Sequence, residues 1–178
     1  KTAYEITYGD WSSDVCSSDL SAVPALVRGV DPFPVDVTDP AGELRLLSFI
    51  WPDQEERLER TRAAIRIAHD HPPRVDTGSA DEWLPGMLGE HRGAHIVVFH
   101  SIVWPYLGTK VQSAVRESLE TAGSRASKDS KVFWARMEPA GAVADVRVTV
   151  WDGTAQEEHR LAEVGYHGRG LRWIEGTD

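Results

Sequence analysis

The run HIVVFHS, at residues 95–101, constrains the fold more than any other feature of the chain. A nearly unbroken apolar run of this length is typical of a strand at the centre of a parallel sheet, where both faces are buried. Elsewhere, short apolar runs alternate with amphipathic segments, which is the pattern of an α/β domain. The sequence therefore predicts a layered α/β fold built around this strand.

The remaining elements are predicted from periodicity and from residues that start or stop helices. Asp39 and Pro40 are typical of a helix start, and Trp51 with Pro52 separates that helix from a second one that begins near Asp53. Further helices are predicted at residues 81–88 and 105–122, and strands at 23–30, 74–77, 131–137, 144–151, 159–164 and 171–174. We expect residues 131–137 to form a last parallel strand, followed by an antiparallel edge.

The first twenty residues are interpreted as a different kind of sequence. KTAYE and DWSSDVCSSDL match the translation of the two constant parts of a short-read sequencing adapter, in the frame AAG ACG GCA TAC GAG. Residues 6–9 then correspond to the index between those parts. We therefore expect residues 1–20 to be an artefact, and residues 21–178 to be the C-terminal part of one α/β domain.

Composition narrows the classes of partner and chemistry. The formal net charge is -9, so the chain repels phosphate backbones and we expect no nucleic-acid partner. The single cysteine, Cys16, lies in the adapter-like segment, which leaves no thiol for disulfides, zinc or nucleophilic catalysis. No apolar run approaches the roughly 20 residues that span a bilayer. We expect a cytoplasmic protein without membrane contact. The absence of asparagine suggests a GC-rich bacterium.

The histidines do not predict a metal site. His69 and His71 lie at a predicted helix end, where imidazolium is favourable without a metal. His95 and His100 are separated by an odd number of positions in a strand, so they face opposite sides of the sheet. Zinc ligands need convergent geometry, and this spacing does not supply it.

His100 and Ser101 are the predicted catalytic residues, because they end the apolar strand with two polar side chains. Ligands of open parallel sheets bind at the carboxyl ends of the strands. An equally good alternative is a turn in which Ser101 caps backbone amides. A hydrolase that uses Ser101 has little support, because no Gly-x-Ser-x-Gly motif surrounds it.

Acidic residues that follow strands are the predicted cofactor ligands. Asp31 follows the first predicted strand, where a carboxylate can accept hydrogen bonds from ribose hydroxyls. Its alternative role is in a turn, as for Asp36, while Asp39 is expected to cap a helix. Glu138, which follows the predicted strand at residues 131–137, is a weaker candidate for the same role. The glycines of GYHGRG, at residues 165–170, precede a strand rather than a helix, so a turn is predicted there.

Three stretches carry a resemblance to a known family. They are residues 28–65, which include Trp51-Pro52-Asp53-Gln54, then VVFHSIVWPYL, and the closing RLAEVGYHGRGLRW. Together they resemble the uncharacterised bacterial family named domain of unknown function 2332, over essentially all of residues 21–178. The resemblance implies a sheet similar to that of class I S-adenosylmethionine-dependent methyltransferases. HIVVFHSIVWPYL is similar to their fourth strand and the helix after it, although His95 stands where their pattern usually has an aspartate.

The resemblance implies a partial Rossmann-like, three-layer sheet with antiparallel C-terminal strands. Full-length members carry a glycine-rich cofactor motif further toward the N-terminus, after a first strand that lies between the second and the fourth. This chain lacks that motif. We therefore expect a gap or a foreign pairing beside HIVVFHS, and S-adenosylmethionine in the full-length protein but no cofactor on this fragment.

Two functions from different classes follow. The first is an S-adenosylmethionine-dependent methyltransferase-like enzyme acting on an unknown small-molecule or protein substrate, with Asp31 on the cofactor side and His100 and Ser101 on the substrate side. The second is a non-catalytic α/β protein-interaction domain, which an exposed cluster of Trp51, Trp104 or Trp151 would support.

Overall fold

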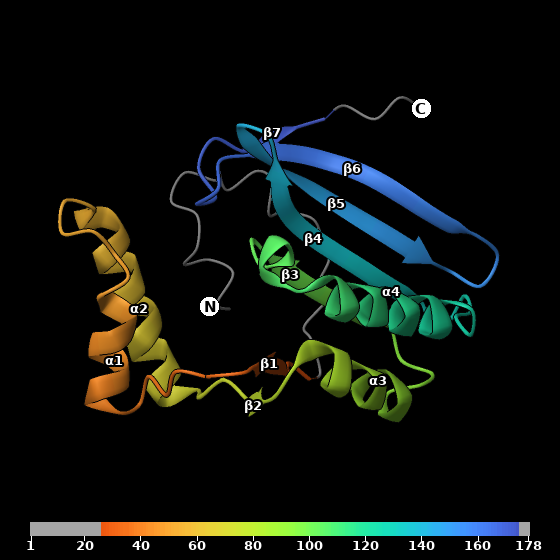
Figure 1. The fold of residues 1–178 in the computed structure, drawn as a ribbon, viewed down its shortest axis with the longest axis horizontal. Helices are drawn as coiled ribbons and strands as arrows, with labels where there is room; N and C mark the ends of the chain where they lie inside the picture. Colours follow the sequence, from red (N-terminus) through yellow and green to blue (C-terminus); the bar gives the residue numbers. More distant parts are fainter. Residues whose placement is uncertain (1–25, 175–178) are drawn as a thin grey trace. The chain divides into compact units, whose positions relative to one another are not determined.

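The chain divides into two compact units, Lys1–Gly78 and Ser79–Asp178. The computed structural model describes residues 26–78 of the first and residues 79–174 of the second (Figure 1). The adapter-like residues 1–20 lie outside the described residues, so their predicted origin stays a prediction. Among the described helices, none combines the length and the apolar character needed to cross a membrane.

The N-terminal unit is a parallel pair of short strands joined by two helices. Strand β1 (Gly29–Asp31) pairs with β2 (Val75–Thr77), and α1 (Pro40–Leu47) and α2 (Glu55–Asp70) form the connection. Parallel strands need a crossover of this kind, because the chain must return to the end of the sheet where it began. The predicted helix pair and the second strand are therefore confirmed.

The start of α1 follows the predicted chemistry. The carboxylate Oδ2 of Asp39 accepts a hydrogen bond from the amide of Gly42 at 3.2 Å, and Pro40 occupies the first turn. The strand before it is shorter than predicted, because Leu26, Val27 and Arg28 are not paired in a ladder. The beginning of that predicted strand, residues 23–25, lies outside the described residues.

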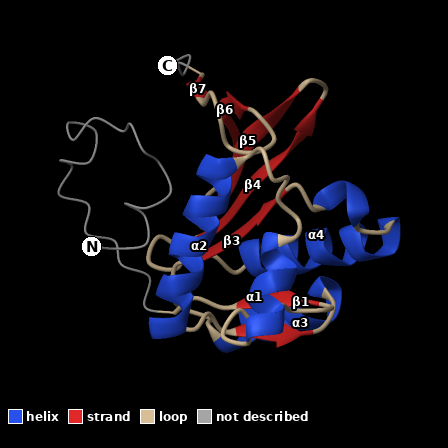
Figure 2. Cartoon of the chain, turned by 90° about the vertical axis from the view of Figure 1, so that its left-hand side faces the viewer, coloured by secondary structure: helices blue, strands red, loops and turns tan. Residues whose placement is uncertain are grey.

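The C-terminal unit contains a mixed five-stranded sheet with two α-helices. Its elements are α3 (Ala80–Glu90), β3 (Ile96–Ser101), the 3-10 helix η2 (Trp104–Tyr106), α4 (Thr109–Gly123), β4 (Val132–Ala140), β5 (Val143–Trp151), β6 (Gln156–Val164) and β7 (Arg172–Trp173). The strands lie side by side in chain order (Figure 2). Strands β3 and β4 are parallel and all later pairs are antiparallel. This confirms the predicted last parallel strand and its antiparallel edge.

The hydrophobic core of this unit lies on one face of the sheet, under both helices. Leu119 of α4 is completely buried at its centre. The other core residues are Leu84 and Leu88 of α3, Val115 and Ala122 of α4, and Val132, Trp134 and Trp151 of the sheet. The end of α4 approaches the sheet closely, since a Cβ on Gly123 would lie 2.4 Å from the Trp151 ring.

Strand β3 differs from its prediction in two ways. It has one neighbour, β4, among the described strands, so it is an edge strand rather than a central one. Its side chains alternate, and Val97 and Phe99 remain 65% and 67% exposed. The cause is that α3 and α4 pack on the same face, which gives residues 79–174 taken alone two layers. The three-layer arrangement expected for the whole domain stays a prediction. Within the described residues the other edge of β3 has no partner strand. The choice between a gap and a foreign pairing with residues 1–20 falls outside the described residues and stays a prediction.

The helix predicted at residues 105–122 is divided. Pro105 belongs to the short helix η2, and Gly108 has the extended backbone of a helix N-cap before α4 begins at Thr109. Gly123 ends α4 as predicted. The glycines of residues 165–170 form a turn between β6 and β7, with Gly168 and Gly170 at positive φ, so the predicted turn is confirmed.

Candidate functional site

Five side chains converge where the parallel strands of the C-terminal unit end. They come from β3, η2, α4 and β4 and comprise His100, Trp104, Arg116, Trp134 and Glu138, which we call the His100 cluster. The parallel register explains their convergence. His100 pairs with Arg136, so Trp134 and Glu138 lie two positions to either side of that partner and point to the same face.

His100 uses both of its ring nitrogens. Nδ1 lies 2.7 Å from Oε1 of Glu138, and the indole Nε1 of Trp134 donates to Nε2 at 3.0 Å. An indole nitrogen only donates, so Nε2 must be the unprotonated nitrogen. His100 is therefore the neutral tautomer that carries its proton on Nδ1 and donates it to Glu138.

Burial keeps His100 neutral. Desolvation lowers the pKa of His100 below its ordinary value, although the hydrogen bond and the charge of Glu138 act in the opposite direction. The positive charges of Arg136 and Arg116 add to the lowering. A second proton on Nε2 would also face the indole N–H of Trp134, which leaves two donors opposed.

Glu138 also holds the loop that follows β3. Its Oε1 accepts from the backbone amide of Val103, and its Oε2 accepts from that of Trp104, both at 3.2 Å. Ile102 between strand and loop has a φ of 52°, which is a costly conformation for a β-branched residue. Strain of this kind persists where the surroundings enforce it, and it concentrates at functional sites.

The aromatic side chains form a platform for cations. Trp104 stacks on His100 with ring centroids 5.1 Å apart and planes inclined by 17°. The guanidinium carbon of Arg116 lies 4.9 Å from the Trp104 ring centroid and 5.2 Å from that of Trp134. Arg136 lies over the same Trp134 ring at 4.1 Å. Cation–π contacts of this geometry are favourable and orient the guanidinium groups.

The side chains of His100 and Ser101, which were predicted as a catalytic pair, lie on opposite faces of β3. The two residues alternate on β3, and Ser101 is exposed while the His100 side chain is mostly buried. No hydrogen bond joins the Ser101 hydroxyl to a histidine within the described part of the chain, so the arrangement of a hydrolase triad is absent there. Both roles, on the substrate side, remain predictions.

Asp31 lies in the N-terminal unit, at the carboxyl end of β1. Its Oδ1 accepts from the amide of Phe33 at 2.7 Å, which is the turn role given above as its alternative. The residue is exposed. Asp36 makes the corresponding contact with the amide of Thr38 at 2.9 Å. The turn role of Asp31 is thus present, and its role toward a cofactor stays a prediction.

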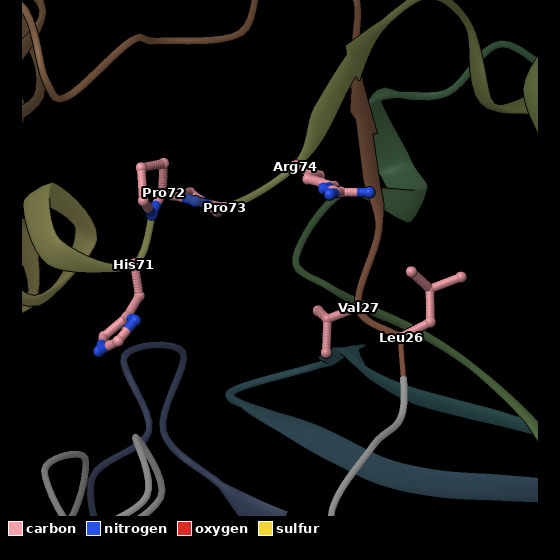
Figure 3. Close-up of a pocket in the computed structure, with 6 residues that line it drawn as sticks. All are labelled: Leu26, Val27, His71, Pro72, Pro73 and Arg74. Carbon is pink, nitrogen blue, oxygen red and sulfur yellow. The ribbon is translucent and has the colours of Figure 1, made fainter.

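Other features of the described residues do not form a site. No group of three or more His, Cys, Asp or Glu side chains there is arranged to hold a metal ion. A surface hollow of about 550 Å³ in the N-terminal unit is lined by Leu26, Val27, His71, Pro72, Pro73 and Arg74. Figure 3 shows that the side chains of His71 and Arg74 point in different directions, so they do not converge on a ligand.

Sequence reasoning identified part of the His100 cluster. It named His100 and, with less weight, Glu138, because both are polar residues at strand ends. It missed Trp104, Arg116 and Trp134 as members. The available signal was the parallel pairing of the two strands, which places residues of β4 beside His100 once the register is known.

The fold defines a mixed α/β protein whose polar cluster lies at the end of a parallel strand pair. The chain belongs to a family of uncharacterised proteins conserved in bacteria, DUF2332, whose model matches residues 9–173. The match confirms the family resemblance, and it begins within the adapter-like segment. Neither the curated proteins nor the solved structures contain a match to the chain.

Proposed function

We propose that this chain is part of an S-adenosylmethionine-dependent methyltransferase-like enzyme. The support is the resemblance described above, together with two parallel strand pairs that are each connected by helices. Parallel strands with such crossovers place their carboxyl ends at one edge, where small ligands bind in open α/β sheets.

The observation that carries the proposal is the open edge of β3. This strand is hydrogen-bonded to β4 on one side only within the described sheet, and Val97 and Phe99 on it are exposed. An apolar strand with an unpaired edge is a pairing surface. The resemblance implies a further strand at this edge, followed by the glycine-rich loop that contacts the cofactor.

The contacts of Asp31, His100 and Ser101 suggest the role that we propose for each residue. Asp31, exposed at the end of β1, would accept hydrogen bonds from the cofactor ribose. Ser101 and the loop after it would face the methyl acceptor, which is a small molecule or a protein. His100 would position that loop through Glu138 rather than accept a proton, because both of its ring nitrogens are already engaged. Methyl transfer depends mainly on aligning the acceptor with the sulfonium, so it does not require a conserved set of acid–base or nucleophilic residues that a sequence motif would reveal.

The test is a calorimetric titration of the protein encoded by the complete gene with S-adenosylmethionine. Asp31→Asn retains an oxygen for the Phe33 amide but removes the charge, and it is expected to weaken binding about tenfold or more. Asp36→Asn is the matched control, because Asp36 makes the same kind of turn contact. Residues 21–178 alone are expected not to bind. An absence of binding to the complete protein would overturn the proposal.

The alternative of a protein-interaction domain rests on the exposed apolar residues of the C-terminal unit. Val97, Phe99 and Tyr106 are exposed, whereas Trp151 is buried and Trp104 is half-buried in the His100 cluster. Trp51 is 72% exposed in the N-terminal unit. Trp104 and Trp151 therefore do not form the expected exposed tryptophan cluster. We would prefer protein interaction over methyl transfer only if the complete protein failed to bind S-adenosylmethionine.

A further inference from the structure

Arg116 differs from the other arginines beside the His100 cluster. The arginines of β4 to β7 on this side of the sheet each form an ion pair, and they are Arg136, Arg147, Arg160 and Arg172. Their partners are Asp145, Glu158 and Glu163. No carboxylate oxygen of the described residues lies within ion-pair distance of Arg116. Its five N–H donors therefore have no acidic partner in this part of the chain.

The position of Arg116 is nevertheless well defined. Its guanidinium lies over two indole rings, those of Trp104 and Trp134, while the residue as a whole is exposed on α4. The two cation–π contacts restrict the guanidinium, and the residue remains accessible to solvent. A guanidinium group that is already oriented loses less conformational entropy when it binds a ligand. Its two parallel N–H groups match the two oxygens of a carboxylate or phosphate, so it can bind them bidentately.

Glu138, the acidic member of the cluster, does not form an ion pair with Arg116. Both oxygens of Glu138 accept hydrogen bonds, from His100 and from two loop amides. The positive charge of Arg116 also affects the nearby Arg136. Burial first lowers the pKa of Arg136, and the charge of Arg116 lowers it further, while Glu158 raises it. Arg116 is thus an oriented guanidinium without an ion-pair partner among the described residues, whereas Arg136 is paired with Glu158.

We propose that Arg116 is an oxyanion-binding residue, which receives a carboxylate or phosphate group of the molecule that occupies the site. That this molecule is the methyl acceptor rests on the proposed function. The binding of the oxyanion itself requires no cofactor, so a binding measurement without S-adenosylmethionine separates failure of this proposal from failure of the other.

The experiment is a titration of the 178-residue chain with inorganic phosphate, and separately with acetate, at constant ionic strength. The readouts are the Nε–H signal of Arg116 and the indole signals of Trp104 and Trp134 in ¹H–¹⁵N spectra. We expect saturable shifts that Arg116→Gln weakens about tenfold or more. Arg116→Lys keeps the charge but not the fork, and it should restore only part of the affinity. The anion that binds with the higher affinity shows whether Arg116 prefers a phosphate or a carboxylate.

Arg125→Gln is the matched control, because Arg125 is an exposed arginine just after the same helix. It is expected to leave the titration unchanged. Equal shifts in the wild type and in Arg116→Gln, or shifts that do not saturate, would show an adventitious ion only and overturn the proposal. Because Arg116 is exposed, the variant should fold, and an unchanged pattern of the other amide signals verifies this. If it does not fold, Arg116→Lys decides, since full wild-type affinity in that variant contradicts bidentate binding.

Discussion

The Nδ1 atom of His100 lies 2.7 Å from Oε1 of Glu138, and this pair joins the end of β3 to the end of β4. The same carboxylate accepts two amides of the loop that follows β3, so one side chain connects a strand end, a neighbouring strand and a loop. Trp134 closes the arrangement by donating to the other nitrogen of His100. The loop conformation, including the positive φ of Ile102, therefore depends on this network.

The lowered pKa of His100 predicts that stability falls with acid. The unfolded histidine titrates near its ordinary value of 6.5, whereas the folded one has a lower pKa. Below about pH 6.5 the unfolded state binds the proton more strongly, so the free energy of unfolding decreases as the pH falls from 6.5 toward the folded pKa. Urea unfolding at about pH 7.5 and about pH 5.5 measures this decrease.

The control for this pH dependence is a comparison of two histidine variants. His100→Asn removes the titrating group and should reduce the difference between the two pH values. His159→Gln, at an exposed position of β6, should leave it as in the wild type. Identical pH dependence in the wild type and in His100→Asn would contradict the neutral, buried tautomer.

Removal of Glu138 tests the connection between strand and loop. Glu138→Ala leaves the Nδ1–H of His100 and the amides of Val103 and Trp104 without their acceptor, and should reduce the free energy of unfolding by about 2–4 kcal/mol. Glu138→Gln retains one acceptor oxygen and should cost about half as much. Glu157→Ala, on the exposed end of β6, should change stability by less than about 0.5 kcal/mol. A Glu138→Ala variant as stable as Glu157→Ala would refute the role given to this carboxylate.

The contact between α4 and the sheet predicts opposite effects at two glycines. A Cβ on Gly123 would lie 2.4 Å from the Trp151 ring, so Gly123→Ala should reduce the free energy of unfolding by about 2 kcal/mol or more. Gly89 in α3 has open space around the same position, and Gly89→Ala should raise stability by up to about 1 kcal/mol through helix propensity. Chemical denaturation of both variants measures the contrast. Equal effects would mean that α4 packs differently.

Local patterns predicted most elements because they depend on nearby residues. The cap of α1 by Asp39 and the strand at residues 95–101 are of this kind. The exposure of Val97 and Phe99 was not predictable, because it depends on which faces the helices cover. The partner of His100 lies 38 residues away and follows only from the parallel register of β3 and β4. The platform under Arg116 needed the same register and the position of α4 in addition.

The most direct test of the central claim, that this chain continues a methyltransferase-like domain, is the genomic DNA sequence upstream of the Ser21 codon in the source organism. We expect this DNA to encode a strand, an acidic residue and a glycine-rich turn into a helix, which would supply the neighbour of β3 and the cofactor loop. A start codon immediately upstream, or an unrelated domain, would contradict a methyltransferase-like domain and leave protein interaction as the leading function.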